Sequence, residues 1–221
     1  MQIHTKKNGL AVAGFVSVMM LTQTASAQDS SLPDMGKLTA TGGVSQVEGA
    51  GGGGLTPWAL ITGYGSKDSY GANAHYTQVS TQDYRLKTYG VAVGIADEFE
   101  FSFAKQEFTG SLAPLNMLNL KQDIFGVKYR IAGDAVYDQA GWMPQIALGV
   151  QYKRDASIGG LGALGITNVK QLGAKDDKGT DFYMSATKIY LAQSLLVNGT
   201  LRMTKANQMG LLGFGGDLEN K

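Results

Sequence analysis

Cysteine is absent from this 221-residue chain, which excludes disulfide scaffolds, cysteine-ligated zinc, iron–sulfur clusters and thiol catalysis. Its absence is also compatible with an oxidising compartment, where an unpaired thiol is a liability. Proline is scarce, at 4 residues, whereas glycine is abundant, at 31 residues, and no low-complexity tract appears. This composition favours ordered, glycine-rich strands and turns over a disordered chain.

Long hydrophobic runs are missing as well, and no apolar stretch reaches the ~20 residues that a transmembrane helix needs. A shorter apolar run, residues 10–21, follows Lys6 and Lys7 near the N-terminus. The small residues Ala-Ser-Ala at 25–27 come directly after it, at the positions that a signal peptidase recognises. We therefore predict a cleavable signal peptide over residues 1–27.

Charge of one sign is not in excess. The formal net charge is +1, and removal of Lys6 and Lys7 with the signal peptide leaves 17 basic and 18 acidic residues, a net charge of −1. This balance shows no basic field for nucleic acid. An exported chain without a transmembrane helix is either soluble or a closed β-barrel.

Apolar and polar residues alternate with a period of two along much of the remaining chain. Phe125, Val127, Tyr129 and Ile131, for example, are separated by glycine, lysine and arginine. Such alternation indicates strands with one apolar and one polar face. Most of these segments are about 9–11 residues long, enough for a tilted strand to cross a bilayer. The expected strands, about nine in all, cover residues 37–46, 56–64, 70–79, 86–95, 99–108, 122–132, 144–153, 180–190 and 194–205.

Connection lengths alternate too. Short connections are expected at residues 65–69, 96–98 and 192–193, and long ones at residues 47–55, 109–121 and 154–179. Short turns on the periplasmic side and long loops outside are typical of outer-membrane barrels, and so are aromatic residues near strand ends. The 133–143 connection departs from the pattern because it is too long for a periplasmic turn.

These patterns predict an all-β protein, an antiparallel transmembrane β-barrel of the Gram-negative outer membrane; a soluble β-domain is the alternative. We expect the signal peptide at 1–27, a short periplasmic segment at 28–36, barrel strands over 37–205 and a glycine-rich outer loop at 206–221. Nine strands is an odd number, whereas bacterial barrels are even, and no aromatic residue ends the chain. We therefore expect a C-terminally truncated sequence and an incomplete barrel.

Several longer stretches carry a family resemblance. They read LTATGGVSQVEGA at 38–50, GLTPWA at 54–59, DIFGVKYR at 123–130, GDAVYDQ at 133–139, LGAKDD at 172–177, DFYMSATK at 181–188 and KANQMGLLGFGGD at 205–217. Through them the chain resembles an uncharacterised family of proteobacterial exported proteins, the domain of unknown function family numbered 3034. The resemblance covers most of the mature chain and implies an outer-membrane barrel that continues past Lys221. It implies no activity and no site residue.

Five charged residues fall on the polar, lumen-facing sides of predicted strands: Glu100, Lys128, Arg130, Lys153 and Arg202. A ring of charges can set the ion preference of a pore, and four bases against one acid favour anions if the lumen is open. Alternatively, the charges form cross-strand ion pairs that fill or stiffen the interior. The sequence leaves both interpretations open.

Other candidate sites are weaker. Residues 49–56 have the spacing of a phosphate-binding loop, but Leu55 replaces the required lysine, so a flexible outer loop is the preferred interpretation. His75, the one histidine outside the signal peptide, falls on the lumen face, and Ser80 and Ser102 are candidate nucleophiles that nothing places beside it. We interpret it as an ordinary lumen histidine.

Two further sets are explained without a ligand. Lys188 falls on the lipid-facing side, where its ammonium can extend to the headgroups. Asp176, Asp177 and Asp181 could offer oxygen ligands to calcium, but they lack a calcium-loop pattern and are better explained as a solvated acidic turn. We predict no catalytic residue, cofactor or metal.

The leading functional prediction is an outer-membrane barrel that acts as a passive channel for small solutes, narrowed by residues 109–121 and 154–179. The alternatives are a non-pore barrel for adhesion or envelope integrity and a barrel-embedded lipid-modifying enzyme that would use His75. The expected partners are outer-membrane lipid, lipopolysaccharide and the barrel-assembly machinery, and nucleic acid is not among them.

Overall fold

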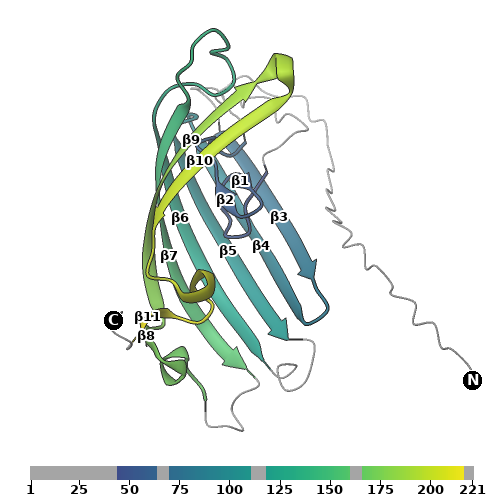
Figure 1. The fold of residues 1–221 in the computed structure, drawn as a ribbon, viewed down its shortest axis with the longest axis vertical. Coiled ribbons are helices and arrows are strands. Elements are labelled where there is room, and N and C mark those ends of the chain that lie inside the picture. Colours follow the sequence, from purple (N-terminus) through teal and green to yellow (C-terminus); the bar gives the residue numbers. More distant parts are fainter. Residues whose placement is uncertain (1–43, 64–69, 111–117, 160–165, 217–221) are drawn as a thin grey trace, which may run out of the picture.

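The computed structural model describes residues 44–63, 70–110, 118–159 and 166–216, and its main element is one strongly curled antiparallel sheet (Figure 1). Seven strands form it in the order β10-β9-β7-β6-β5-β4-β3, so each strand pairs with its neighbours along the chain as a meander. The strands are β3 (Tyr70–Ser80), β4 (Tyr84–Ile95), β5 (Phe99–Gly110), β6 (Asn119–Ala132), β7 (Gln145–Gly159), β9 (Lys178–Tyr190) and β10 (Leu195–Met203). The sheet is a half-barrel, which confirms the predicted all-β antiparallel class.

The remaining elements are short. β1 (Gly52–Gly53) pairs with β2 (Thr56–Pro57), and β8 (Ala174–Asp176) pairs with β11 (Phe214–Gly216). The 3₁₀ turns are η3 (Val169–Leu172), η4 (Leu191–Gln193) and η5 (Asn207–Gly210). No helix within the described ranges has the length and apolar character needed to span a membrane.

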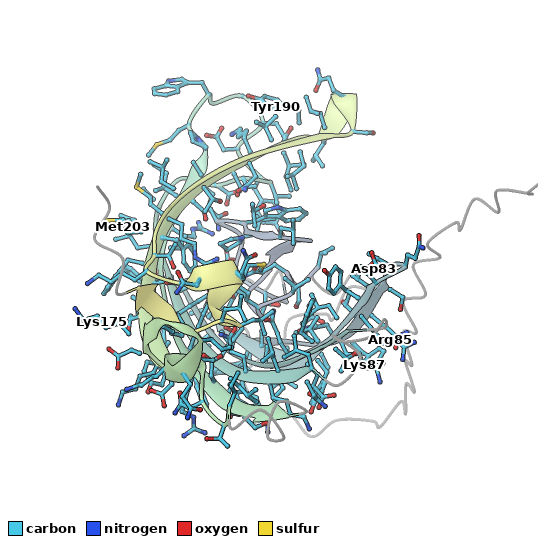
Figure 2. The ribbon with its side chains drawn as sticks, turned by 60° about the horizontal axis from the view of Figure 1, so that its bottom comes forward. Asp83, Arg85, Lys87, Lys175, Tyr190 and Met203 are labelled. Carbon is cyan, nitrogen blue, oxygen red and sulfur yellow. The ribbon has the colours of Figure 1, made fainter. Side chains whose placement is uncertain are left out.

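The two faces of the sheet differ in polarity as the alternation predicted. Apolar side chains cover the convex face, where Val127 is 45% exposed and Leu201 is 70% exposed. Buried polar and charged side chains line the concave face, among them Gln106, Gln151 and Ser185. Figure 2 looks toward one end of the curl and shows side chains projecting both outward from the ribbon and into its interior. This polarity is the reverse of that of a soluble β-domain, whose apolar residues face inward.

The two ends of the sheet are distinct. We call the end where β4, β6 and β9 finish the turn rim, and the end where β3, β5, β7 and β10 finish the loop rim. At the turn rim, β4 and β5 are joined through Ala96 and Asp97, which both have positive φ angles, 55° and 52°. This left-handed pair matches the twist of a hairpin, so the predicted short connection at 96–98 is confirmed.

The long 133–143 connection at the turn rim folds back over the outer side of β9. Its carbonyl oxygens surround Lys188, whose Nζ donates to the carbonyls of Asp134 at 3.4 Å, Met143 at 3.2 Å and Asp138. Lys188 is only 4% exposed. The expectation that its ammonium reaches the headgroups is therefore wrong, because this connection covers it. That cover also explains why the connection exceeds a simple turn.

The described residues of two expected barrel strands do not belong to the sheet. Residues 44–46 contribute only an isolated bridge between Ser45 and Gly51, and within 56–63 only Thr56–Pro57 forms a strand. These residues lie on the concave side instead, packed inside the curl. The expected strand at 37–46 otherwise falls outside the described residues, as do the predicted signal peptide at 1–27 and the segment at 28–36.

Residues 206–216 were expected to form an outer loop but are ordered against the loop rim. β11 pairs with β8 there, and Phe214 is 3% exposed. The Nζ of Lys153 donates to the carbonyl of Met209 at 3.0 Å, which ties η5 to the interior. Glycines allow this tight path, since a β-carbon at Gly210 would collide with the side chain of Gln122. The segment is a small cap, and residues 217–221 lie outside the described ranges.

Candidate functional site: a filled concave face

Residues 44–63, which we call the inner segment, occupy the concave side of the sheet (Figure 1). It is held mainly through its own backbone groups, which form hydrogen bonds with polar side chains that point inward from the sheet. All seven strands hydrogen-bond to it, through Asn73 on β3, Thr88 on β4, Glu100 and Gln106 on β5, Lys128 on β6, Gln145 and Lys153 on β7, Ser185 and Thr187 on β9, and Thr200 and Arg202 on β10.

The central anchor is an ion pair between Glu100 and Lys128, which stand opposite each other on β5 and β6. Lys128 Nζ lies 3.0 Å from Glu100 Oε2, and each side chain is 1% exposed. Glu100 accepts hydrogen bonds from the backbone N–H groups of Gly51 and Thr62, both at 2.9 Å. Lys128 donates to the carbonyls of Gly51 and Leu60, also at 2.9 Å. The pair therefore holds both arms of the β1–β2 hairpin.

A second anchor is a four-charge cluster toward the loop rim. Glu48 of the inner segment pairs with Lys153 and, at 2.6 Å, with Arg202. Asp181 pairs with the same two bases, at 3.2 Å from Lys153 and 2.7 Å from Arg202. Both carboxylates are fully buried. Two acids and two bases balance, and this balance makes burial of the charges tolerable.

Glycine brings the inner segment close enough to be held. A β-carbon at Gly51 would lie 2.8 Å from Glu100 Oε2, so any larger residue would push the segment off its anchor. On the sheet side, Gly94 of β4 faces the carbonyl oxygen of Thr62, and no side chain separates them. The glycine content noted in the sequence thus serves a close approach between segment and sheet.

Gly94→Ala is expected to lower the free energy of unfolding by about 1–3 kcal/mol, because the added methyl would collide with the Thr62 carbonyl, a backbone atom. Urea unfolding measures the effect. Gly199→Ala on β10 is the matched control, since no atom lies within 4 Å of its β-carbon position. Equal losses in the two variants would contradict a close contact at Gly94.

Arg130 lies apart from these clusters, at the turn rim. It pairs with Asp97 of the β4–β5 turn and lies 3.7 Å from Asp134. A cavity of about 180 Å³ adjoins Asp97 and Arg130. Burial raises the pKa of Asp97 to about 6 from 3.8, although the neighbouring Arg130 acts in the opposite direction. Burial acts to raise the pKa of Asp134, but backbone hydrogen bonds from Tyr137 and Val136 and the charge of Arg130 outweigh it and lower that pKa.

This pKa shift predicts a pH dependence. Since the folded pKa of Asp97 exceeds the unfolded value, the linked stabilisation is complete below pH 3.8 and is lost as the pH rises through about 6. After allowance for solvent screening at the rim, the free energy of unfolding of wild type should fall by up to about 2 kcal/mol between pH 4 and pH 7, relative to that of Asp97→Asn. Urea midpoints across that range measure the difference, and parallel curves for the two proteins would count against it.

The predicted lumen charges are thus distributed among three clusters. Glu100, Lys128, Lys153 and Arg202 do face the interior, and Arg130 faces the turn rim. The four-to-one excess of bases disappears, because Glu48, Asp181 and Asp97 supply three further acids. Sequence reasoning missed these partners. For one of them a signal was available, because Asp181 lies on the same strand face as Tyr183, Ser185 and Thr187.

The weaker candidates are placed as well. Residues 49–56 are not a flexible outer loop, because the β1–β2 hairpin lies inside the curl, where Glu100 and Lys128 hold its backbone. His75 lies on the inner side of β3, opposite Gly90, and neither ring nitrogen has a hydrogen-bond partner among the described residues. Asp176 pairs with Lys170 at 3.3 Å, whereas Asp181 is inside the sheet, so the acidic residues do not act together.

The fold and its interior define a curled half-barrel whose concave face is filled by its own inner segment. The chain belongs to the family described as Protein of unknown function (DUF3034), whose model matches residues 41–221. The predicted family membership is confirmed. No curated protein and no solved structure matched the chain.

Proposed function

We propose that this protein is an outer-membrane β-barrel whose interior is occupied by its own inner segment, and that it serves the envelope as a non-pore barrel. One observation carries the proposal: large apolar side chains are exposed over the convex face, while charged side chains are buried on the concave face. In water this polarity exposes a large apolar patch, which a monomer rarely tolerates. In lipid the same face is solvated by hydrocarbon.

The sheet edges add a requirement. In the part of the chain that the structure describes, β3 and β10 each have a partner on one side only. Lipid offers no hydrogen-bond partners, so a membrane-embedded sheet must close. The proposal therefore requires that both edges be paired in the membrane, and export would follow from the signal peptide predicted at residues 1–27.

The passive channel is the alternative. It requires a continuous aqueous path, but the inner segment occupies the concave side with buried contacts to every strand of the sheet. The filled interior therefore favours the non-pore role over the channel. His75 has no hydrogen-bond partner among the described residues, which lends no support to a lipid-modifying enzyme.

Membrane embedding can be tested with single labels, since the chain has no cysteine. Val127→Cys on the convex face and Lys175→Cys on β8 would each carry a polarity-sensitive fluorophore, and brominated lipids would serve as quenchers. The proposal expects strong quenching at position 127 and little at position 175. Recovery of the exported protein in the soluble periplasmic fraction, with equal quenching at both positions, would refute it.

Planar-bilayer recording separates the non-pore role from the channel. Wild type is expected to insert without conductance steps, because the inner segment blocks the lumen. Regular single-channel steps from wild type would overturn the non-pore role while leaving the membrane location intact.

A further inference from the structure

Among the residues that the structure describes, the convex face carries a band of cations at one of its two rims and not at the other. Toward the loop rim, outward-pointing positions on five strands hold basic residues, and Figure 2 shows two of them, Arg85 and Lys87, near the β3–β4 connection. We call this set the cation band; its members are Arg85 and Lys87 on β4, Lys105 on β5, Lys121 on β6, Arg154 on β7 and Lys178 on β9.

The strand register places the band in ranks across the sheet. Lys105 stands opposite Asp123, Asp123 opposite Arg154, and Arg154 opposite Lys178. A second rank, nearer the loop rim, runs from Lys87 through Glu107 to Lys121. Neighbouring strands lie about 5 Å apart and same-face residues about 7 Å apart along a strand. The cations therefore form a compact strip that crosses the sheet.

The two carboxylates in the strip are recessed beneath the cations. Asp123 is 12% exposed and lies 3.6 Å from Lys105 and 3.2 Å from Arg154, which are 46% and 56% exposed. Glu107, 30% exposed, lies 3.6 Å from Lys121, which is 46% exposed. The acids hold the bases in place, but the surface presented outward is positive. Within the described ranges no carboxylate pairs with Arg85, Lys87 or Lys178.

The band begins where the apolar surface ends. One step toward the turn rim from the Lys105 rank, the outward positions on β4 to β7 are Val91, Phe103, Phe125 and Tyr152. Beyond this rank the outward positions of these four strands stay apolar. At the turn rim the only outward-pointing charge on a described strand is Lys188, which the 133–143 connection covers. The two boundaries of the apolar surface thus differ sharply in charge.

We infer that the cation band binds the phosphate groups of anionic lipids at one membrane interface. This inference rests on the proposed membrane location, because it takes the apolar surface to lie in hydrocarbon. A strip of cations directly beside such a surface lies at headgroup depth, where basic side chains attract anionic headgroups. Lysine and arginine both bind phosphate, and arginine does so through two parallel hydrogen bonds. The one-sided placement suits a membrane whose two leaflets differ in anionic lipid.

Electron spin resonance of spin-labelled lipids tests the inference in phosphatidylcholine vesicles that contain the full chain. We compare labelled phosphatidic acid with labelled phosphatidylcholine as the lipid held at the protein surface. Wild type is expected to prefer phosphatidic acid by about fivefold, and the preference should fall toward one at molar salt, where charges are screened over about 3 Å.

Two matched triple variants locate the effect. Arg85→Gln, Lys87→Gln and Lys178→Gln together should reduce the preference to about twofold or less. The charge-retaining set Arg85→Lys, Lys87→Arg and Lys178→Arg should keep it. These three residues have no carboxylate partner among the described residues, so their neutralisation leaves no acid unpaired, and heat-modifiable gel mobility confirms the fold.

The outcomes are separable from failure of the membrane proposal. Equal preference in wild type and the neutralised variant, with both proteins holding lipid, overturns the cation band alone. If neither lipid is immobilised at the protein surface, the membrane location itself is overturned. Inorganic phosphate at matched ionic strength is expected to leave the preference unchanged; selective loss on adding phosphate would identify a site for the free ion and overturn the lipid assignment.

Discussion

We expect Lys153→Met to lower the free energy of unfolding by about 3–5 kcal/mol and to release the inner segment from the sheet. This loss of stability is the largest effect of a single substitution that we expect. The change leaves Glu48 and Asp181, both fully buried, with Arg202 as the one remaining base of the cluster. An uncompensated buried charge is far more costly than a missing ion pair on the surface. Urea unfolding measures the loss, and limited proteolysis within residues 44–63 detects the release.

The control is Lys170→Met, which removes the same kind of side chain from an exposed pair. Lys170 lies 3.3 Å from Asp176, with the two side chains 49% and 55% exposed. Exposed pairs contribute up to about 1 kcal/mol, so this variant should unfold close to the wild-type midpoint and resist proteolysis equally. Similar losses in both variants would show that the buried cluster does not anchor the inner segment.

Exchange of the central pair, Glu100→Lys with Lys128→Glu, is expected to remain destabilised by about 3 kcal/mol or more, although opposite charges again face each other. The reason is the backbone around them. Glu100 accepts from two N–H groups and Lys128 donates to two carbonyls, so the exchange turns donors toward donors and acceptors toward acceptors. Urea unfolding of the double variant measures the loss.

The matched exchange uses the same two strands. Glu107 and Lys121 also stand opposite each other on β5 and β6, but on the convex face, 3.6 Å apart and partly exposed. Glu107→Lys with Lys121→Glu should change the free energy of unfolding by less than about 1 kcal/mol. If the central exchange were equally mild, the pair would act through charge alone and the hydrogen bonds to the inner segment would be of little consequence.

The seven strands of the sheet were predictable because period-two polarity is a local property of the sequence. β5 illustrates this, as Phe99, Phe101 and Phe103 alternate with Glu100 and Ser102, and the structure places the two sets on opposite faces. The strand expected at 56–64 was wrong for the same reason. Its apolar residues are buried inside the curl, and a local pattern does not distinguish burial against the sheet from burial in lipid.

The site was half predictable. Parity along a strand places Lys128, Lys153 and Arg202 on the inner side, and the structure agrees. The alternation of side chains along a strand does not show which residue pairs with them. Glu48, for example, reaches the cluster from a segment with almost no regular structure. Pairing across such sequence separations depends on the path of the chain, which no local pattern encodes. The expectation of excess positive charge inside arose from that gap.

Contact between the inner segment and every strand has a kinetic consequence. The carbonyl of Pro57 accepts a hydrogen bond from Thr200, 143 residues further along the chain. The inner segment leaves the ribosome early and therefore lacks its hydrogen-bond partners until the last strand of the sheet has been synthesised. Such non-local closure makes folding slow, and an assembly intermediate would carry bare carboxylates and ammonium groups until the final hairpin is joined.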